Sequence, residues 1–192
     1  NKEFLSNNIK KTIVGDNNVI GDNNIIYDDV IIGNDNIFHE NVIIYPGSNI
    51  GNNNIFLRGT IIGDIPNSVD YDYTKIKFGK VIIKNNNVFH RNCIVHSSLE
   101  DSTEIVSNNI FLDDVNIGHD SKICDNINFY PRSILAGYVK VHSYAGIGMN
   151  SSIHQRIVIG EYSFIGMNNP VTKNVFPFFI TKNVNLDFFS FE

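Results

Sequence analysis

Large apolar residues recur at every sixth position of the chain, with polar residues and glycines between them. The longest uninterrupted series is Phe111, Ile117, Ile123, Phe129, Leu135, Val141, Ile147, Ile153, Ile159, Ile165 and Val171. Neither a helix of 3.6 residues per turn nor an alternating strand has this period. Hexapeptide repeats are typical of a parallel β-helix, in which each coil is one supersecondary unit. The pattern therefore predicts an all-β solenoid.

The N-terminal part of the chain has the same spacing, at Val14, Ile20, Ile26, Ile32, Phe38, Ile44, Ile50, Phe56 and Ile62. Asparagines precede many of these positions, as in Asn17-Asn18 and Asn53-Asn54. Because Asn and Gly tolerate left-handed backbone angles, we expect them at the corners between short strands. If three hexads make one triangular coil, the chain forms roughly seven to eight coils. At about 4.8 Å per coil, the column is about 35–40 Å long.

The period is interrupted twice, at about 64–80 and at about 99–108. Each interruption is interpreted as a loop extruded from one coil, and long loops in a compact repeat are often functional. Pro177 ends the regular pattern, since proline cannot donate to a strand ladder. We expect a β-helix domain over 1–177 and a phenylalanine-rich tail over 178–192 that caps its open end.

The residue before each apolar position is often β-branched as well, for example Ile13, Val19 and Ile25. Strand alternation directs these side chains outward. One explanation is strand propensity alone. The other is that neighbouring subunits cover these rows, since long apolar strips are uncommon on the surface of monomers.

Charged residues make up 18% of the chain, and its formal net charge is −5. No basic stripe is present, so nucleic acid is not expected as a partner. Two cysteines, Cys93 and Cys124, are too few for a disulfide framework, and reduced thiols favour a cytoplasmic location. No stretch approaches the 18 apolar residues of a membrane helix, so no transmembrane segment is expected.

Residues 18 apart lie on the same corner of adjacent coils, which gathers several polar side chains on one edge. These are His119, Tyr138, His154 and Gln155, spread over roughly 10 Å along the axis. Asp120 follows His119 and can orient an imidazole. Gly137 leaves its N–H open to a developing oxyanion. A lone corner histidine is ordinarily just solvated, but contributions from three coils favour a site.

Three segments carry a family resemblance: Ile117-Gly118-His119-Asp120, then Leu135-Ala136-Gly137, then Ile153-His154-Gln155. Their sequences and intervals resemble the hexapeptide-repeat acyltransferases with a left-handed β-helix. Among these, the chain looks most like the UDP-N-acetylglucosamine acyltransferases of lipid A synthesis. The helical domain with which that family ends has no counterpart in the sequence.

The resemblance implies a role for each matching residue. His119 would be the general base, Asp120 its polarising partner and Gly137 the N–H donor to the oxyanion. His154 and Gln155 would line the acceptor and acyl-chain cleft. Asn116 and Tyr138 stand where the family has histidines and are expected to contact substrate. The loop at 64–80 matches the acceptor-binding loop, and the family is a homotrimer with its sites between subunits.

The expected activity is transfer of an acetyl or other short acyl group to a hydroxyl or amine of a nucleotide-linked sugar. This reaction would belong to surface-polysaccharide or lipopolysaccharide synthesis. Acetyl-CoA is the first expected donor, another acyl-CoA or an acyl carrier protein the next, and no permanently bound cofactor is expected. The alternative is the acyl-carrier-protein-dependent UDP-N-acetylglucosamine acyltransferase of lipid A synthesis itself.

Two other classes remain open on this sequence. A γ-class carbonic anhydrase needs three histidines from two chains around one zinc ion. The close histidine pair expected on one coil is lacking, so we expect no metal site. A non-catalytic binding solenoid is the other class, and the clustered polar edge argues against it.

Overall fold

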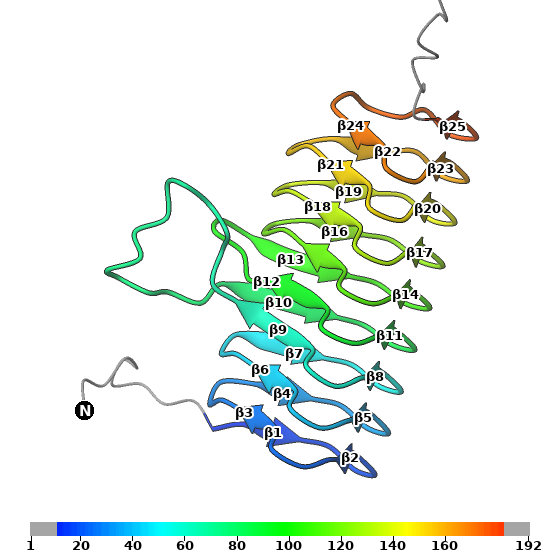
Figure 1. The fold of residues 1–192 in the computed structure, drawn as a ribbon. Helices are drawn as coiled ribbons and strands as arrows, with labels where there is room; N and C mark the ends of the chain where they lie inside the picture. Colours follow the sequence, from blue (N-terminus) through cyan, green and yellow to red (C-terminus); the bar gives the residue numbers. More distant parts are fainter. Residues whose placement is uncertain (1–10, 183–192) are drawn as a thin grey trace, which may run out of the picture.

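The structure, a computed structural model, describes residues 11–182, which form a stacked column of 25 short strands (Figure 1). The backbone visits three sheets in turn, and all the pairings between strands are parallel. Partner residues in adjacent coils are usually 18 positions apart, as for Ile13 and Ile31. The residues that the structure describes contain no helix. The predicted all-β left-handed parallel β-helix is thereby confirmed.

The three sheets are called A, B and C in the order in which the chain enters them. Sheet A contains β1 (Ile13–Val14), β4 (Ile31–Ile32), β7 (Ser48–Ile50), β10 (Lys80–Ile83), β13 (Ser102–Ile105), β16 (Lys122–Ile123), β19 (Lys140–Val141) and β22 (Val158–Ile159). Sheet B contains β2 (Val19–Ile20), β5 (Ile37–Phe38), β8 (Ile55–Phe56), β11 (Val88–Phe89), β14 (Ile110–Phe111), β17 (Asn128–Phe129), β20 (Gly146–Ile147), β23 (Phe164–Ile165) and β25 (Ile180–Thr181). Sheet C contains β3 (Ile25–Ile26), β6 (Ile43–Ile44), β9 (Ile61–Asp64), β12 (Ile94–His96), β15 (Asn116–Ile117), β18 (Ile134–Leu135), β21 (Ser152–Ile153) and β24 (Pro170–Val171).

The inward residue of each interior coil is buried, and the residue before it usually faces outward. In β18, for example, Leu135 is 1% exposed while Ile134 is 47% exposed. Five inward phenylalanines of sheet B form a continuous stack along the axis, with centroid distances from 4.5 to 5.0 Å: Phe38, Phe56, Phe89, Phe111 and Phe129. Burial of this apolar column is the main stabilising contribution, because strands of two residues have little stability alone.

The corners have the left-handed backbone expected from the asparagines. Asn17, Asn23 and Asn53 have φ values of 58°, 57° and 56°, a region that asparagine tolerates better than most residues. The asparagine after such a corner residue can turn inward. Asn36, for example, is fully buried, and its Oδ1 accepts the Asn54 backbone N–H at 2.9 Å. Asparagine therefore shapes the corner and also satisfies buried backbone groups between coils.

Two details of the predicted winding change. Sheet B has nine strands, so the column has slightly more levels than the seven to eight expected. The first predicted loop is present, since residues 65–79 lie between β9 and β10 and project from the column (Figure 1). The second, expected over 99–108, is wrong in extent, because Ser102–Ile105 form β13 within sheet A. Lys80 of β10 pairs with Ser102 of β13, which is 22 positions later and not the usual 18. The coil that ends at β13 therefore contains a four-residue insertion.

The ladder continues past the boundary expected at residue 177. Ile180 and Thr181 form β25 and pair with β23. Residues 183–192, most of the tail for which a capping role was expected, lie outside the described residues, so that role stays a prediction. None of the described elements is a helix that could cross a lipid bilayer.

Candidate functional site

The edge between sheets C and A carries the polar residues that the 18-residue spacing places together. Strands β15, β18 and β21 are hydrogen-bonded neighbours in sheet C. The chain leaves each of them through the same kind of corner, whose second residue is His119, Gly137 or Gln155 in successive coils. The local sequence determines the conformation of each corner, and stacking of the coils aligns the three residues in one row along this edge.

His119 and Asp120 form a buried pair at this edge. The imidazole Nδ1 lies 3.0 Å from Asp120 Oδ2, and the two residues are 7% and 5% exposed. Because a carboxylate accepts and does not donate, the Nδ1 that faces it carries the proton. The other nitrogen, Nε2, is then left with a free lone pair in the neutral ring, which is the form that a general base requires.

The Asp120 carboxylate is surrounded by backbone donors. Oδ2 accepts the N–H of Leu99 at 2.8 Å, and Oδ1 accepts those of Glu100 and Asp101 at 3.2 and 3.0 Å. Burial by itself would raise the pKa of Asp120. The hydrogen bonds from Leu99, Asp101, His119 and Glu100 outweigh that effect, so the pKa is lowered and the group stays ionised.

Gly137 lies directly against the imidazole. A Cβ at this position would collide with His119, meeting Cε1 at 2.5 Å and Nε2 closer still. The Gly137 N–H makes no hydrogen bond within residues 11–182, whereas Asp16 N, at the same position of an earlier corner, donates to Asn34 Oδ1 at 2.8 Å. Because Gly137 has no side chain, the His119 ring can lie close to its backbone, and the Gly137 N–H remains free to bind a ligand.

Tyr138 packs edge-on against the His119 ring, at a centroid distance of 5.0 Å and an angle of 84°. Its hydroxyl donates to Glu100 Oε1 at 2.9 Å, and the Arg156 guanidinium lies 4.1 Å from the ring centroid. Burial, followed by the bond to Glu100, raises the pKa of Tyr138. The phenol is thus held between two charged residues and buttresses the imidazole.

A cleft opens where the 65–79 loop approaches this corner. From the loop it is lined by Asn67, Ser68, Val69 and Asp70, and from the column by Asn116, Gly118, His119, Ile134, Leu135, Ala136, Gly137 and Gln155. The structure thus brings together the predicted loop and four of the predicted site residues: His119, Gly137, Asn116 and Gln155. His154 does not line the cleft. It is exposed, and its Nδ1 lies 3.3 Å from the backbone carbonyl of Gln155.

The sequence reasoning missed the residues that hold the pair in place. Besides the three backbone donors, Thr103 Oγ1 accepts the Asp120 backbone N–H at 2.8 Å, and Glu100 and Arg156 fix Tyr138. The one available signal was the break in the six-residue period near 99, which indicates an insertion but not what it contacts.

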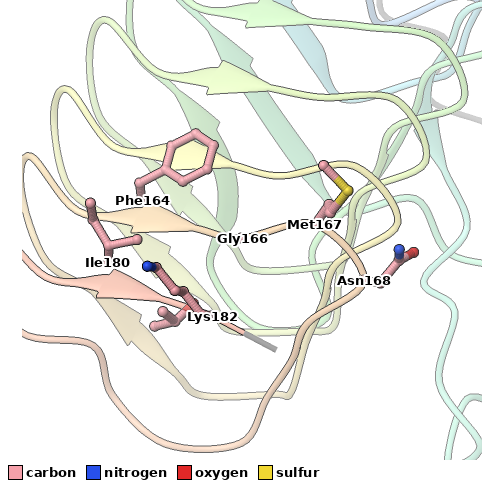
Figure 2. Close-up of a pocket in the computed structure, with 7 residues that line it drawn as sticks. Phe164, Gly166, Met167, Asn168, Ile180 and Lys182 are labelled. Atoms are coloured by element: carbon pink, nitrogen blue, oxygen red, sulfur yellow. The ribbon is translucent and has the colours of Figure 1, made fainter. Parts of the chain in front are cut away.

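A second pocket lies near the C-terminal end of the described residues (Figure 2). Phe164, Met167 and Ile180 give it an apolar wall, and Lys182 lies at its rim. It is built on β23 and β25 of sheet B and contains no histidine or carboxylate. No cluster of three or more His, Cys, Asp or Glu side chains within residues 11–182 is placed to hold a metal ion.

No family model matches the chain. The acyl-(acyl-carrier-protein)–UDP-N-acetylglucosamine O-acyltransferase of Aliivibrio fischeri is 34% identical over 101 residues, which are 51% of this chain and 38% of that protein. The corresponding protein of Burkholderia orbicola is 28% identical over 122 residues, 62% of this chain and 45% of its own length. The chain thus spans less than half the length of these curated relatives.

Solved structures match over more of the chain. The UDP-N-acetylglucosamine acyltransferase of Francisella novicida superposes with a TM-score of 0.84 at 30% identity, covering 91% of this chain and 66% of that one. The corresponding structure from Bacteroides fragilis gives 0.82 at 25% identity, covering 90% and 68%. The similarity therefore includes nearly the whole described column.

Proposed function

We propose, from the similarity of its β-helix to UDP-N-acetylglucosamine acyltransferases, that this chain transfers an acyl group from a thioester to a sugar nucleotide. The acceptor is a hydroxyl of UDP-N-acetylglucosamine or of a close analogue. The relatives are named for an acyl carrier protein donor and for O-acylation. They favour the alternative interpretation of the sequence over transfer of a short acyl group from acetyl-CoA.

The observation that carries this proposal is the orientation of the His119 ring. Its Nδ1 faces the Asp120 carboxylate, and its Nε2 is turned toward Gly137 at the wall of the cleft. A base on one side of the reacting atoms and a free N–H beside it are the two groups that acyl transfer requires.

In the proposed reaction, His119 Nε2 accepts the proton of the sugar hydroxyl as its oxygen attacks the thioester carbonyl. The Gly137 N–H donates to the oxygen that becomes negative in the tetrahedral intermediate. The C–S bond then breaks, and the proton on Nε2 passes to the departing thiolate. No acyl-enzyme is formed, and burial raises the pKa of Cys93 to about 12, so its thiol is a poor nucleophile.

The loop and the remaining predicted residues are assigned to substrate binding. Asn67 to Asp70, together with Asn116 and Gln155, line the cleft and provide amide, hydroxyl and carboxylate groups for a sugar. We further propose a homotrimer in which a second copy closes the open side of the cleft, where the exposed His154 would contact substrate. Tyr138 supports the His119 ring and cannot replace an imidazole as a base.

The first test is replacement of the base. His119→Ala is expected to lower kcat by about two to four decades, because general-base catalysis contributes that much. The assay follows transfer to UDP-N-acetylglucosamine from acyl carrier proteins carrying chains of different lengths, with acetyl-CoA in parallel. His39→Ala is the control, since His39 is an exposed histidine beside Glu40 in an early coil. Turnover near wild type in His119→Ala would disprove the assignment.

A further inference from the structure

The four-residue insertion before β13 lies at the same edge of the column as His119. Residues 99–101, here called the Leu99–Asp101 turn, connect the end of the β12 corner to Ser102. Coils elsewhere in the column, apart from the one with the 65–79 loop, pass this corner without added residues. The insertion interrupts the regular repeat in the coil that directly precedes the buried pair of His119 and Asp120.

The turn is held by contacts on both sides. Ser98 Oγ donates to the Asp101 carbonyl at 3.1 Å and accepts the Lys80 N–H, at the end of the 65–79 loop, at 2.9 Å. On the other side, Lys122 Nζ donates to Asp101 Oδ2 at 2.9 Å and to Glu104 Oε1 at 2.8 Å. These bonds fix the turn in place although Leu99, Glu100 and Asp101 are exposed.

All three amides of the turn point at one carboxylate. Leu99 N–H shares Asp120 Oδ2 with the imidazole, while Glu100 and Asp101 bind Oδ1. With both oxygens engaged, the carboxylate cannot rotate without breaking several hydrogen bonds at once. The pair formed by His39 and Glu40 shows the contrast. It is exposed, its closest approach is 4.0 Å, and no backbone N–H within residues 11–182 donates to the Glu40 carboxylate.

We propose that the Leu99–Asp101 turn is a positioning element, which fixes the Asp120 carboxylate and thereby the tautomer and orientation of His119. The inference rests on the proposed function, in which His119 is the base. None of the three residues of the turn lines the cleft. The turn contributes to the rate by holding the His119 side chain, through Asp120, in the narrow range of orientations that allows proton transfer.

Leu99 gives the sharpest test, because its contribution is a backbone N–H that proline lacks. Leu99→Pro is expected to lower kcat about tenfold with KM within about twofold of wild type, since the acceptor site is untouched and the base is misplaced. Leu99→Ala keeps the N–H and is the conservative variant expected to restore most of kcat. If Leu99→Pro does not fold, replacing the Leu99 amide by an ester removes the same N–H with little change of shape.

A second measurement needs no substrate. Nitrogen-15 NMR of the imidazole distinguishes the Nδ1–H from the Nε2–H tautomer of His119. Wild type and Leu99→Ala are expected to show the Nδ1–H form, and the proline or ester variant a mixture of both. Wild-type kcat, or an unchanged tautomer, in a folded variant lacking the Leu99 N–H would overturn the proposal. If wild type itself transfers no acyl group, the proposed function fails, and the tautomer alone decides whether the turn positions His119.

Discussion

At the candidate site, the His119 ring packs directly against a residue without a side chain, Gly137. Gly137 leaves room for the imidazole, and a Cβ there would overlap two of its ring atoms. The same residue has a backbone N–H that is unbonded within the described part of the chain. Glycine at this position therefore brings a base and an oxyanion donor side by side, at the cost of the backbone entropy that every glycine loses on folding.

This packing predicts a non-additive pair of substitutions. Gly137→Ala should destabilise the protein by about 1–3 kcal/mol, because the added methyl overpacks a buried site. In the His119→Ala background the same change should cost much less, since the ring that collides with the Cβ is gone. Chemical denaturation of the four proteins of this cycle measures the difference. Equal costs in both backgrounds would show that the ring does not occupy this position.

At the scale of the elements, the phenylalanine stack of sheet B preserves its alignment across both interruptions. Phe56 and Phe89 stack at 5.0 Å although the 65–79 loop separates them in sequence. Phe89 and Phe111 stack at 4.5 Å across the four-residue insertion. Loops leave from the corners, so the inward register of the strands is retained, and a long insertion is tolerated because loop-closure cost grows slowly with length.

The stack predicts graded effects of truncation. Phe89→Ala should lower the free energy of unfolding by about 3–5 kcal/mol, because it creates a cavity in the core and removes the stacking contacts with both Phe56 and Phe111. Phe129 has one stacked neighbour, Phe111, so Phe129→Ala should cost less. Denaturant titration of both variants gives the comparison. Equal losses would mean that ring stacking adds nothing to simple burial.

At the scale of the whole molecule, the outward faces of the three sheets differ. The outer row of sheet C is mostly isoleucine, with Ile25, Ile43, Ile61, Ile94 and Ile134 interrupted by Asn116 and followed by Ser152 and Pro170. The later strands of sheet A present Glu104, Lys122 and Lys140 instead. Because the cleft includes Ile134, a second copy that covers sheet C would also close the cleft. The outer row of sheet B is also largely apolar, with Val19, Ile37, Ile55, Val88 and Ile110. The position of the cleft beside sheet C, together with the isoleucine row, therefore favours association through sheet C.

The proposed homotrimer, associated through sheet C, predicts a particle of three times the 21.7 kDa chain mass in sedimentation equilibrium. Ile43→Glu should shift that equilibrium toward the monomer, because a carboxylate buried in an apolar interface is unpaired. Lys140→Glu, on the outer face of sheet A, is the matched control and should leave the mass unchanged. A monomeric wild-type chain, or a trimer indifferent to Ile43→Glu, would contradict this arrangement.

The sequence alone was sufficient to predict the six-residue repeat, the three-sided column and the corner shared by His119, Gly137 and Gln155. These features follow from a period of six, which is a local property: inward residues must be apolar, and corner residues must accept a left-handed backbone. Once the period is known, positions 18 apart are neighbours, and no knowledge of other contacts is needed.

Only the tertiary structure decided how the site is held. Leu99, Glu100 and Asp101 reach Asp120 across about twenty positions of sequence, and Glu100 reaches Tyr138 across 38. These residues follow no six-residue period, and the break in the period near 99 predicts a longer loop that would include β13. His154 likewise has the right spacing, yet it is exposed and does not line the cleft within one chain. The hydrogen bonds of an insertion depend on its backbone position in the folded chain, which follows no sequence pattern. The geometry of a hexapeptide coil, by contrast, is the same at each repeat and can be predicted from the sequence.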